Sequence, residues 1–251
     1  MTVDEASPGF FGKLPALGDF VQRRLPAPFV RAWDGWLQGC VAGSKAALGE
    51  HWLNTYLSSP IWRFALTPGV AGELGWTGVM IPSVDRVGRY FPLTVATVLP
   101  EHSRTLDVAH AQEWFDRAES VALNALEEQG FDLETFSASV AALGPCPVSA
   151  APSVPVPQQG AVAGGFRLSV DDVNHAPAAL EGLCDMFIRE RFGPSSLWWT
   201  SGSELISPNV IVCRGLPEPA GYTAMLDGQW HSTSWCETDV ASTSVDVLAD
   251  A

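Results

Sequence analysis

The sequence predicts an α+β protein with a mainly antiparallel or mixed sheet and helices packed on its faces, built as one principal domain with a smaller C-terminal extension. Segments with helical periodicity alternate with short runs rich in Val, Thr and aromatic residues, which are typical of strands. The turns between the predicted strands are too short for the crossovers that a parallel sheet needs. With 251 residues, of which 47% are hydrophobic and 17% charged, the chain has the composition of a globular protein with a sizeable core.

The first predicted elements are a loop and a long helix. Residues 9–19 mix glycine, proline and aromatic side chains without a helical or strand period, so we expect a fixed loop there. Pro26 and Pro28 precede a stretch whose apolar residues recur every three or four positions, which predicts an amphipathic helix with proline in its first turn. Its apolar face carries Phe29, Trp33, Trp36, Leu37, Cys40 and Val41.

Three strands and a second helix follow. Apolar runs at residues 61–66, 76–82 and 90–99, separated by glycine and proline, predict the strands. The second helix is expected to begin near Asp107 and to stop at Gly130. Its apolar face carries Trp114, Phe115, Ala118, Val121, Ala122, Ala125 and Leu126. We interpret its acidic face as a solvated side, formed by Glu113, Asp116, Glu119, Glu127 and Glu128.

The C-terminal part is predicted to be more loosely organised. Residues 145–165 combine Pro, Ser, Ala and Gly without a charge, which indicates a linker or mobile loop after an N-terminal domain of residues 1–144. An extension at residues 166–236 is expected to pack on that domain with a helix at 177–191 and strands at 196–200 and 210–214. The inward face of that helix is predicted to carry Leu180, Leu183, Cys184, Phe187 and Ile188. The acidic residues 237–251 are expected to be disordered.

The tryptophans divide into two groups. Five of the ten fall on apolar periods and are predicted to lie in the core: Trp33, Trp36, Trp52, Trp62 and Trp114. Trp198 and Trp199 are adjacent on a predicted strand, so their side chains point to opposite faces of the sheet. One of the two either joins a partner-binding surface or packs beneath a helix on the second face.

Charge and composition exclude several classes of protein. The formal net charge is −14, and residues 101–251 hold 21 Asp and Glu against 6 Arg, so the basic face that nucleic acid requires is missing. No apolar run approaches the roughly 20 residues that span a bilayer, and the first ten residues carry acid where a secretory leader carries Lys or Arg. We therefore expect a cytoplasmic protein without membrane insertion. The five cysteines are scattered and predict neither disulfides nor a zinc site.

The sequence does not predict an enzyme or a bound cofactor. None of the five histidines lies near a nucleophile elbow such as GxSxG. His110 and Glu113 are only two possible metal ligands, which is too few for a metal site. The glycine-rich stretch around Lys13 lacks the GxxxxGK[ST] spacing of a phosphate-binding loop.

A polar cluster is the main candidate for a site. Asp85, Arg86 and Arg89 lie within five residues between two predicted core strands, so they belong at an edge or mouth of the sheet. There they form either a structural ion pair that fixes a loop or a binding surface for a partner. Lys13 and Asp19 in the first loop offer a comparable cation and carboxylate.

Four segments in the same order resemble the TagF family, also called ImpM, of type VI secretion accessory proteins. They are GFFGKLPALGDFVQRRLP at 9–26, the helix with Trp33 and Trp36, SPIWRFAL at 59–66 and GVMIPSVDRVGRYFPLT at 78–94. Residues 195–202 and 215–217 show weaker similarity to the same family. The resemblance implies a cytosolic post-translational repressor that contacts the forkhead-associated scaffold protein. The alternatives are a fixed structural component of the apparatus and, less favoured, a small hydrolase.

The C-terminal tail supports a narrower hypothesis about that partner. Forkhead-associated domains bind phosphothreonine and select the third residue after it, and Asp246 holds that position relative to Thr243. Phosphorylation of Thr243 would add a charge of about −1.5 to −2 that an arginine-lined pocket can bind. The alternative is an ordinary solvated tail.

Overall fold

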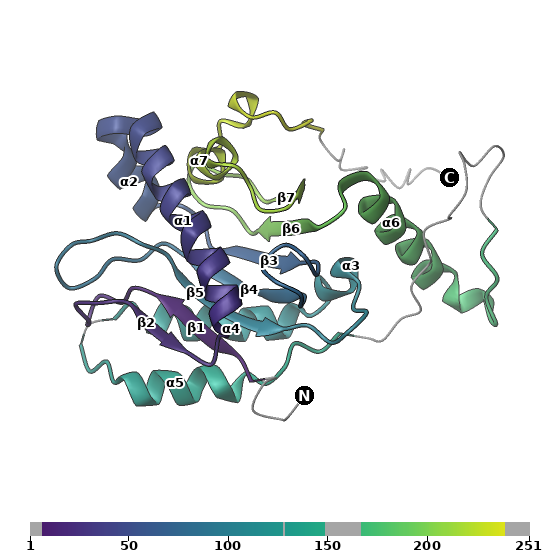
Figure 1. Cartoon of the computed structure of the whole chain (residues 1–251), viewed down its shortest axis with the longest axis horizontal. Helices are drawn as coiled ribbons and strands as arrows, with labels where there is room; N and C mark the ends of the chain where they lie inside the picture. Colours follow the sequence, from purple (N-terminus) through teal and green to yellow (C-terminus); the bar gives the residue numbers. More distant parts are fainter. Residues whose placement is uncertain (1–6, 128, 149–166, 239–251) are drawn as a thin grey trace, which may run out of the picture.

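The computed structural model describes residues 7–127, 129–148 and 167–238. In this part of the chain, seven strands form one antiparallel sheet in the order β2-β1-β5-β4-β3-β6-β7 (Figure 1). The strands are β1 Gly9–Gly12, β2 Val21–Arg23, β3 Trp62–Leu66, β4 Trp76–Ile81, β5 Leu93–Val98, β6 Ser195–Thr200 and β7 Asn209–Arg214. The predicted α+β class with an antiparallel sheet is confirmed.

The helices are α1 Ala27–Leu48, α2 Trp52–Leu57, α3 Thr105–Val108, α4 Gln112–Asn124, α5 Leu133–Ala142, α6 Ala176–Phe192 and α7 Pro219–Asp227. Short 3₁₀ turns are η2 Gly49–His51, η3 Val173–His175 and η4 Trp230–Ser232. None of the helices in the described ranges is both long and apolar enough to cross a bilayer.

Helices cover both faces of the sheet and bury two apolar clusters. On one face, α1, α2 and α7 pack around Trp33, which is fully buried and donates a hydrogen bond of 2.9 Å from Nε1 to the Thr94 hydroxyl. On the other face, α4 and α5 pack on alternate residues of the same strands (Figure 1). β3 shows the alternation, since Phe64 belongs to the first cluster and Ala65 to the second.

The predicted first helix and the predicted strands at 61–66, 76–82, 90–99, 196–200 and 210–214 all form, with boundaries shifted by up to three residues. The predicted second helix is shorter than expected, because a separate turn, α3, precedes it and α4 ends at Asn124. The predicted core tryptophans are buried, apart from Trp36, which is partly buried against the first cluster.

Two predictions about the ends of the fold are wrong. Residues 9–19 were expected to form a loop, but the first four of them form β1, whose Phe10 and Phe11 enter opposite clusters. The predicted inward face of α6 is also wrong, because Leu180 is 59% exposed and the buried residues include Asp185. The face of α6 that is buried, with Asp185, lies against α3, where the Thr105 hydroxyl lies 3.5 Å from an Asp185 carboxylate oxygen.

The segment after residue 166 continues the same sheet, because β6 pairs with β3 and β7 pairs with β6. Most of the predicted linker at 145–165 and of the predicted tail at 237–251 lies outside the described residues.

Candidate functional site

The predicted polar cluster lies where two loops meet beside the ends of β1 and β4. The first loop is residues 13–20, between β1 and β2, and the second is residues 82–92, between β4 and β5. The structure brings together Lys13, Asp85 and Arg89, which are up to 76 residues apart in the sequence. We call residues Asp19, Phe20, Arg86, Val87 and Arg89, which are exposed on these loops, the loop surface.

Asp85 is the centre of the cluster and its side chain is fully buried. One carboxylate oxygen, Oδ2, accepts hydrogen bonds from Lys13 Nζ at 2.8 Å and from Arg89 Nε at 2.6 Å. The other, Oδ1, accepts from the backbone N–H groups of Arg89 at 2.8 Å and Val87 at 3.1 Å. The carboxylate therefore closes its own loop and holds the first loop against it.

The electrostatics of Asp85 favour its charged form. Burial alone would raise the pKa of the Asp85 carboxyl, but the hydrogen bonds from Lys13 and Arg89, together with the positive charge of Lys13, outweigh burial and hold that pKa well below its usual range. Lys13, whose side chain is only 5% exposed, forms its ion pair with the same carboxylate. The pair is an internal brace, so neither group is available to a partner in this structure.

Backbone contacts join the two loops into one unit. The N–H of Arg86 donates to the Leu17 carbonyl at 2.9 Å, and Arg89 Nη2 donates to the Gly18 carbonyl. The Ser83 hydroxyl donates to the Lys13 carbonyl at 2.7 Å. Since each bond crosses from one loop to the other, the loop surface rests on a fixed base.

Two guanidinium groups project from that base. The Arg89 side chain is 54% exposed while Asp85 fixes its orientation. The Arg86 side chain is exposed and forms no ion pair with any residue in the described ranges. Asp19 is exposed as well, and its carboxylate accepts a hydrogen bond of 2.9 Å from the Phe20 N–H.

Sequence reasoning missed Phe20. Its ring is 43% exposed, stacks on Phe11 with the centroids 5.6 Å apart, and meets the edge of Phe91. Lys13 Nζ lies 4.9 Å from the same ring, so Phe20 covers the buried ion pair. A single aromatic residue in a loop that also holds several apolar residues gives no sequence signal that separates this role from an ordinary core position.

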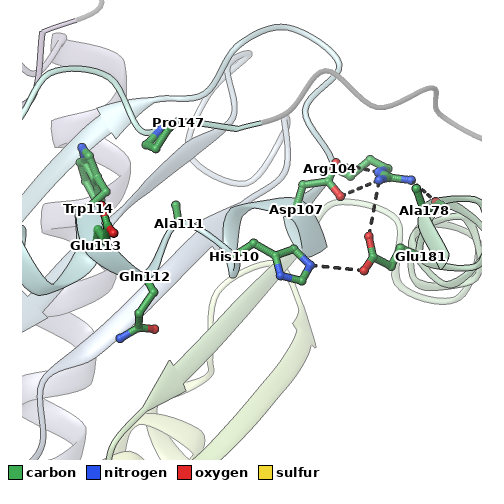
Figure 2. Close-up of a pocket in the computed structure, with 10 residues that line it drawn as sticks. All are labelled: Arg104, Asp107, His110, Ala111, Gln112, Glu113, Trp114, Pro147, Ala178 and Glu181. Atoms are coloured by element: carbon green, nitrogen blue, oxygen red, sulfur yellow. Dashed lines mark hydrogen bonds and ion pairs between the residues drawn. The ribbon is translucent and has the colours of Figure 1, made fainter. Parts of the chain in front are cut away.

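A second polar group lines a pocket of about 670 Å³ between α3, α4 and α6 (Figure 2). Arg104 donates two hydrogen bonds, of 2.7 and 2.6 Å, to the Asp107 carboxylate and a third, of 2.8 Å, to the Ala178 carbonyl. His110 Nε2 lies 3.3 Å from a carboxylate oxygen of Glu181 on α6. Arg104 also lies 3.8 Å from a Glu181 carboxylate oxygen, so its contacts with Asp107, Ala178 and Glu181 fasten α6 to α3. In the described ranges, no three His, Cys, Asp or Glu side chains are grouped as metal ligands.

The remaining predicted site residues have different surroundings. Trp198 is fully buried in the first cluster, against Trp33 and Phe64. Trp199 packs on the opposite face of the sheet, with its ring 4.9 Å from that of Phe115 on α4. Trp199 is partly buried in this position, beneath α4. Thr243 lies outside the described residues.

Comparison with known proteins places the chain among proteins associated with the type VI secretion system. Residues 9–143 match the family model of the TagF N-terminal domain, described as type VI secretion system-associated. The match spans more than half of the chain, and the chain belongs to the TagF family.

The chain is also similar, over almost its whole length, to a solved structure. It is the crystal structure of PA0076 from Pseudomonas aeruginosa PAO1, which is 36% identical, with 94% of this chain and 97% of that chain covered and a TM-score of 0.75. No curated protein matches the chain.

Proposed function

We propose that this protein is a cytoplasmic, post-translational repressor of type VI secretion that acts without catalysis, by binding a protein of the secretion machinery. The partner we propose is the forkhead-associated scaffold protein, which the family resemblance implies. Membership of a type VI secretion-associated family supports the link to that machinery. Binding would repress secretion if it occupies a surface of the scaffold that assembly needs.

The observation that carries this proposal is the loop surface. It presents two guanidinium groups: Asp85 fixes the orientation of Arg89, and a backbone hydrogen bond fixes the main chain of Arg86 against the first loop. Fixing a side chain before binding lowers the entropy lost in the complex. In a protein with a net charge of −14, these two cations are the feature of the loop surface that would attract an acidic partner.

Arg86→Glu tests the proposal directly, because the Arg86 side chain braces nothing in the described structure. Its matched control is Arg31→Glu, on the exposed side of α1, which changes the net charge equally. We expect Arg86→Glu to weaken binding to the purified scaffold protein about tenfold, a loss of about 1.4 kcal/mol, while Arg31→Glu binds like the wild type. Isothermal titration calorimetry measures both affinities.

Two results would contradict the proposal. Unchanged affinity of Arg86→Glu would remove the loop surface as the contact. In the bacterium, deletion of a repressor raises secretion, whereas deletion of a fixed structural component abolishes it, so abolished secretion would favour the structural alternative. Melting temperatures of both variants within about 2 °C of the wild type establish that a change in affinity reflects contact and not folding.

A further inference from the structure

An apolar groove of about 360 Å³ lies beside the loop surface. One wall is Leu57 at the end of α2 and another is Leu123 near the end of α4, with Ile61 and Leu126 also lining the groove. Leu57 is 51% exposed and Leu123 is 48% exposed. Each therefore keeps about half of a large apolar side chain in water.

The fold does not account for these exposed leucines. The buried face of α2 is formed by Trp52, Thr55 and Tyr56, and Leu57 lies outside it. The buried face of α4 is likewise complete without Leu123. Full burial of one leucine contributes about 1.5–3 kcal/mol, so covering the two half-exposed side chains is a substantial source of binding energy for a partner.

The groove and the loop surface are built from the same two loops. Pro15 and Val84 line the groove, and each belongs to one of the two loops. Pro15 lies in the turn closed by the Leu17 N–H and the Leu14 carbonyl, and the Leu17 carbonyl in turn accepts from Arg86. Val84 immediately precedes Asp85. The backbone of Arg86 is thus bonded to the same short segments that form the groove.

We propose that the groove takes an apolar side chain from a protein segment of the secretion machinery that carries Asp or Glu close to that side chain. This inference rests on the proposed function and specifies the kind of segment recognised. A volume near the lower limit of ligand pockets suits one or two side chains. Charge complementarity supports the acidic flank, because Arg86 is exposed and Arg89 half-exposed at the adjoining loops.

Site-specific photo-crosslinking of the full chain in its own bacterium tests the inference. The crosslinker p-benzoylphenylalanine replaces Leu57 in the groove, Val87 on the loop surface or, as a control, Leu180, which is 59% exposed on the distant α6. We expect the first two positions, and not the third, to yield adducts with one component of the secretion machinery. Mass spectrometry is expected to place the adduct of residue 57 on a segment with an apolar residue within one helical turn of Asp or Glu.

A synthetic peptide of that segment then measures the two contributions. Replacing its apolar residue by serine, or introducing Leu123→Asp in the protein, is expected to lower the affinity at least tenfold, whereas Leu180→Asp leaves it unchanged. Replacing the acidic residues of the peptide by amides is expected to lower the affinity and to abolish its dependence on salt.

The following outcomes would overturn one or both proposals. Adducts from residue 87 alone, or adducts of residue 57 with a second copy of this chain or with lipid, would overturn the groove inference and leave the proposed function standing. A captured segment without acidic residues would overturn the charge part. Absence of secretion-component adducts at both residues 57 and 87 would overturn both proposals.

Discussion

Asp85→Asn is the substitution that most directly tests the internal brace. It removes the negative charge beside Lys13, whose ammonium group is 2.8 Å away and whose side chain is 5% exposed. Breaking a buried ion pair by removing one partner costs about 3–5 kcal/mol, since the remaining charge stays buried without compensation. In a domain of this size, 1 kcal/mol shifts the melting temperature by about 2–4 °C, so we expect a drop of about 6–20 °C.

The pH dependence gives an independent check on the same side chain. Because the folded pKa of Asp85 is depressed, its stabilisation is present above the ordinary value of 3.8 and is lost as the pH falls from there toward the folded pKa. Asparagine does not titrate. The difference in unfolding free energy between the wild type and Asp85→Asn is therefore largest at neutral pH and narrows in acid below that value.

Urea unfolding followed by tryptophan fluorescence, at pH 7.5 and at about pH 3, measures both effects. The control is Asp19→Asn, which removes an exposed carboxylate from the neighbouring loop and is expected to change the unfolding free energy by less than about 0.5 kcal/mol. Equal stability of the two variants at pH 7.5, or a gap that stays constant into acid, would refute the account of Asp85 as a buried and charged brace.

Two further predictions test the packing. At Gly78 an added Cβ would lie 2.1 Å from a backbone oxygen of β5, so Gly78→Ala is expected to lower the free energy of unfolding in urea by about 3 kcal/mol or more. The control is Gly35→Ala on α1, where the added Cβ meets open space, and it is expected to raise that free energy by about 0.5–1 kcal/mol. Of the five thiols, only those of Cys184 and Cys236 are exposed, and burial raises the pKa of the Cys40 thiol to about 12. Ellman's reagent is therefore expected to label two thiols in the native protein and five in denaturant. Rapid labelling of a third thiol in the native protein would contradict the buried positions of the other cysteines.

Sequence patterns predicted the elements whose apolar residues repeat over several turns or strands. The α1 pattern is long and proline marks its start, and the strands β3, β4 and β5 are uninterrupted apolar runs. The helices α2, α5 and α7 were not predicted. α5 does carry a readable start signal, since the Asp132 carboxylate caps it by accepting from the Thr135 N–H at 2.7 Å, but its ten residues give few apolar repeats.

The acidic face of α4 is solvated as expected, since Glu113 and Asp116 are exposed, but it also has a partner that the sequence did not predict. Asp116 and Glu119 both pair with Arg63, which lies buried on β3. Nothing in the α4 sequence indicates that a strand more than fifty residues away supplies an arginine to this face. Likewise, the α6 pattern gave the wrong inward face because its position is set by polar contacts to α3.

The composition of the candidate site could be anticipated, but the roles of its members could not. Asp85, Arg86 and Arg89 stand together in the sequence, and their position between two strands located them at the mouth of the sheet. Which of them is buried depends on Lys13, 72 residues earlier, reaching Asp85. The groove depends on α2 and α4, which cover opposite faces of the sheet, each placing a leucine beside these loops, and no local pattern contains that arrangement.

This division of roles determines how variants at the site are to be interpreted. Asp85 and Lys13 lie beneath the surface, so a binding defect in their variants arises from loss of the loop geometry and is accompanied by lost stability. Arg86 is exposed and unpaired among the described residues, so its variants separate contact from folding. Arg89 does both, since its guanidinium is half-exposed and bonded to Asp85. Burying the Asp85 carboxylate costs desolvation free energy, which its hydrogen bonds offset. Because these bonds come from both loops, they hold the two loops together as one unit. Exposed ion pairs contribute little stability and would not hold the loops in this way.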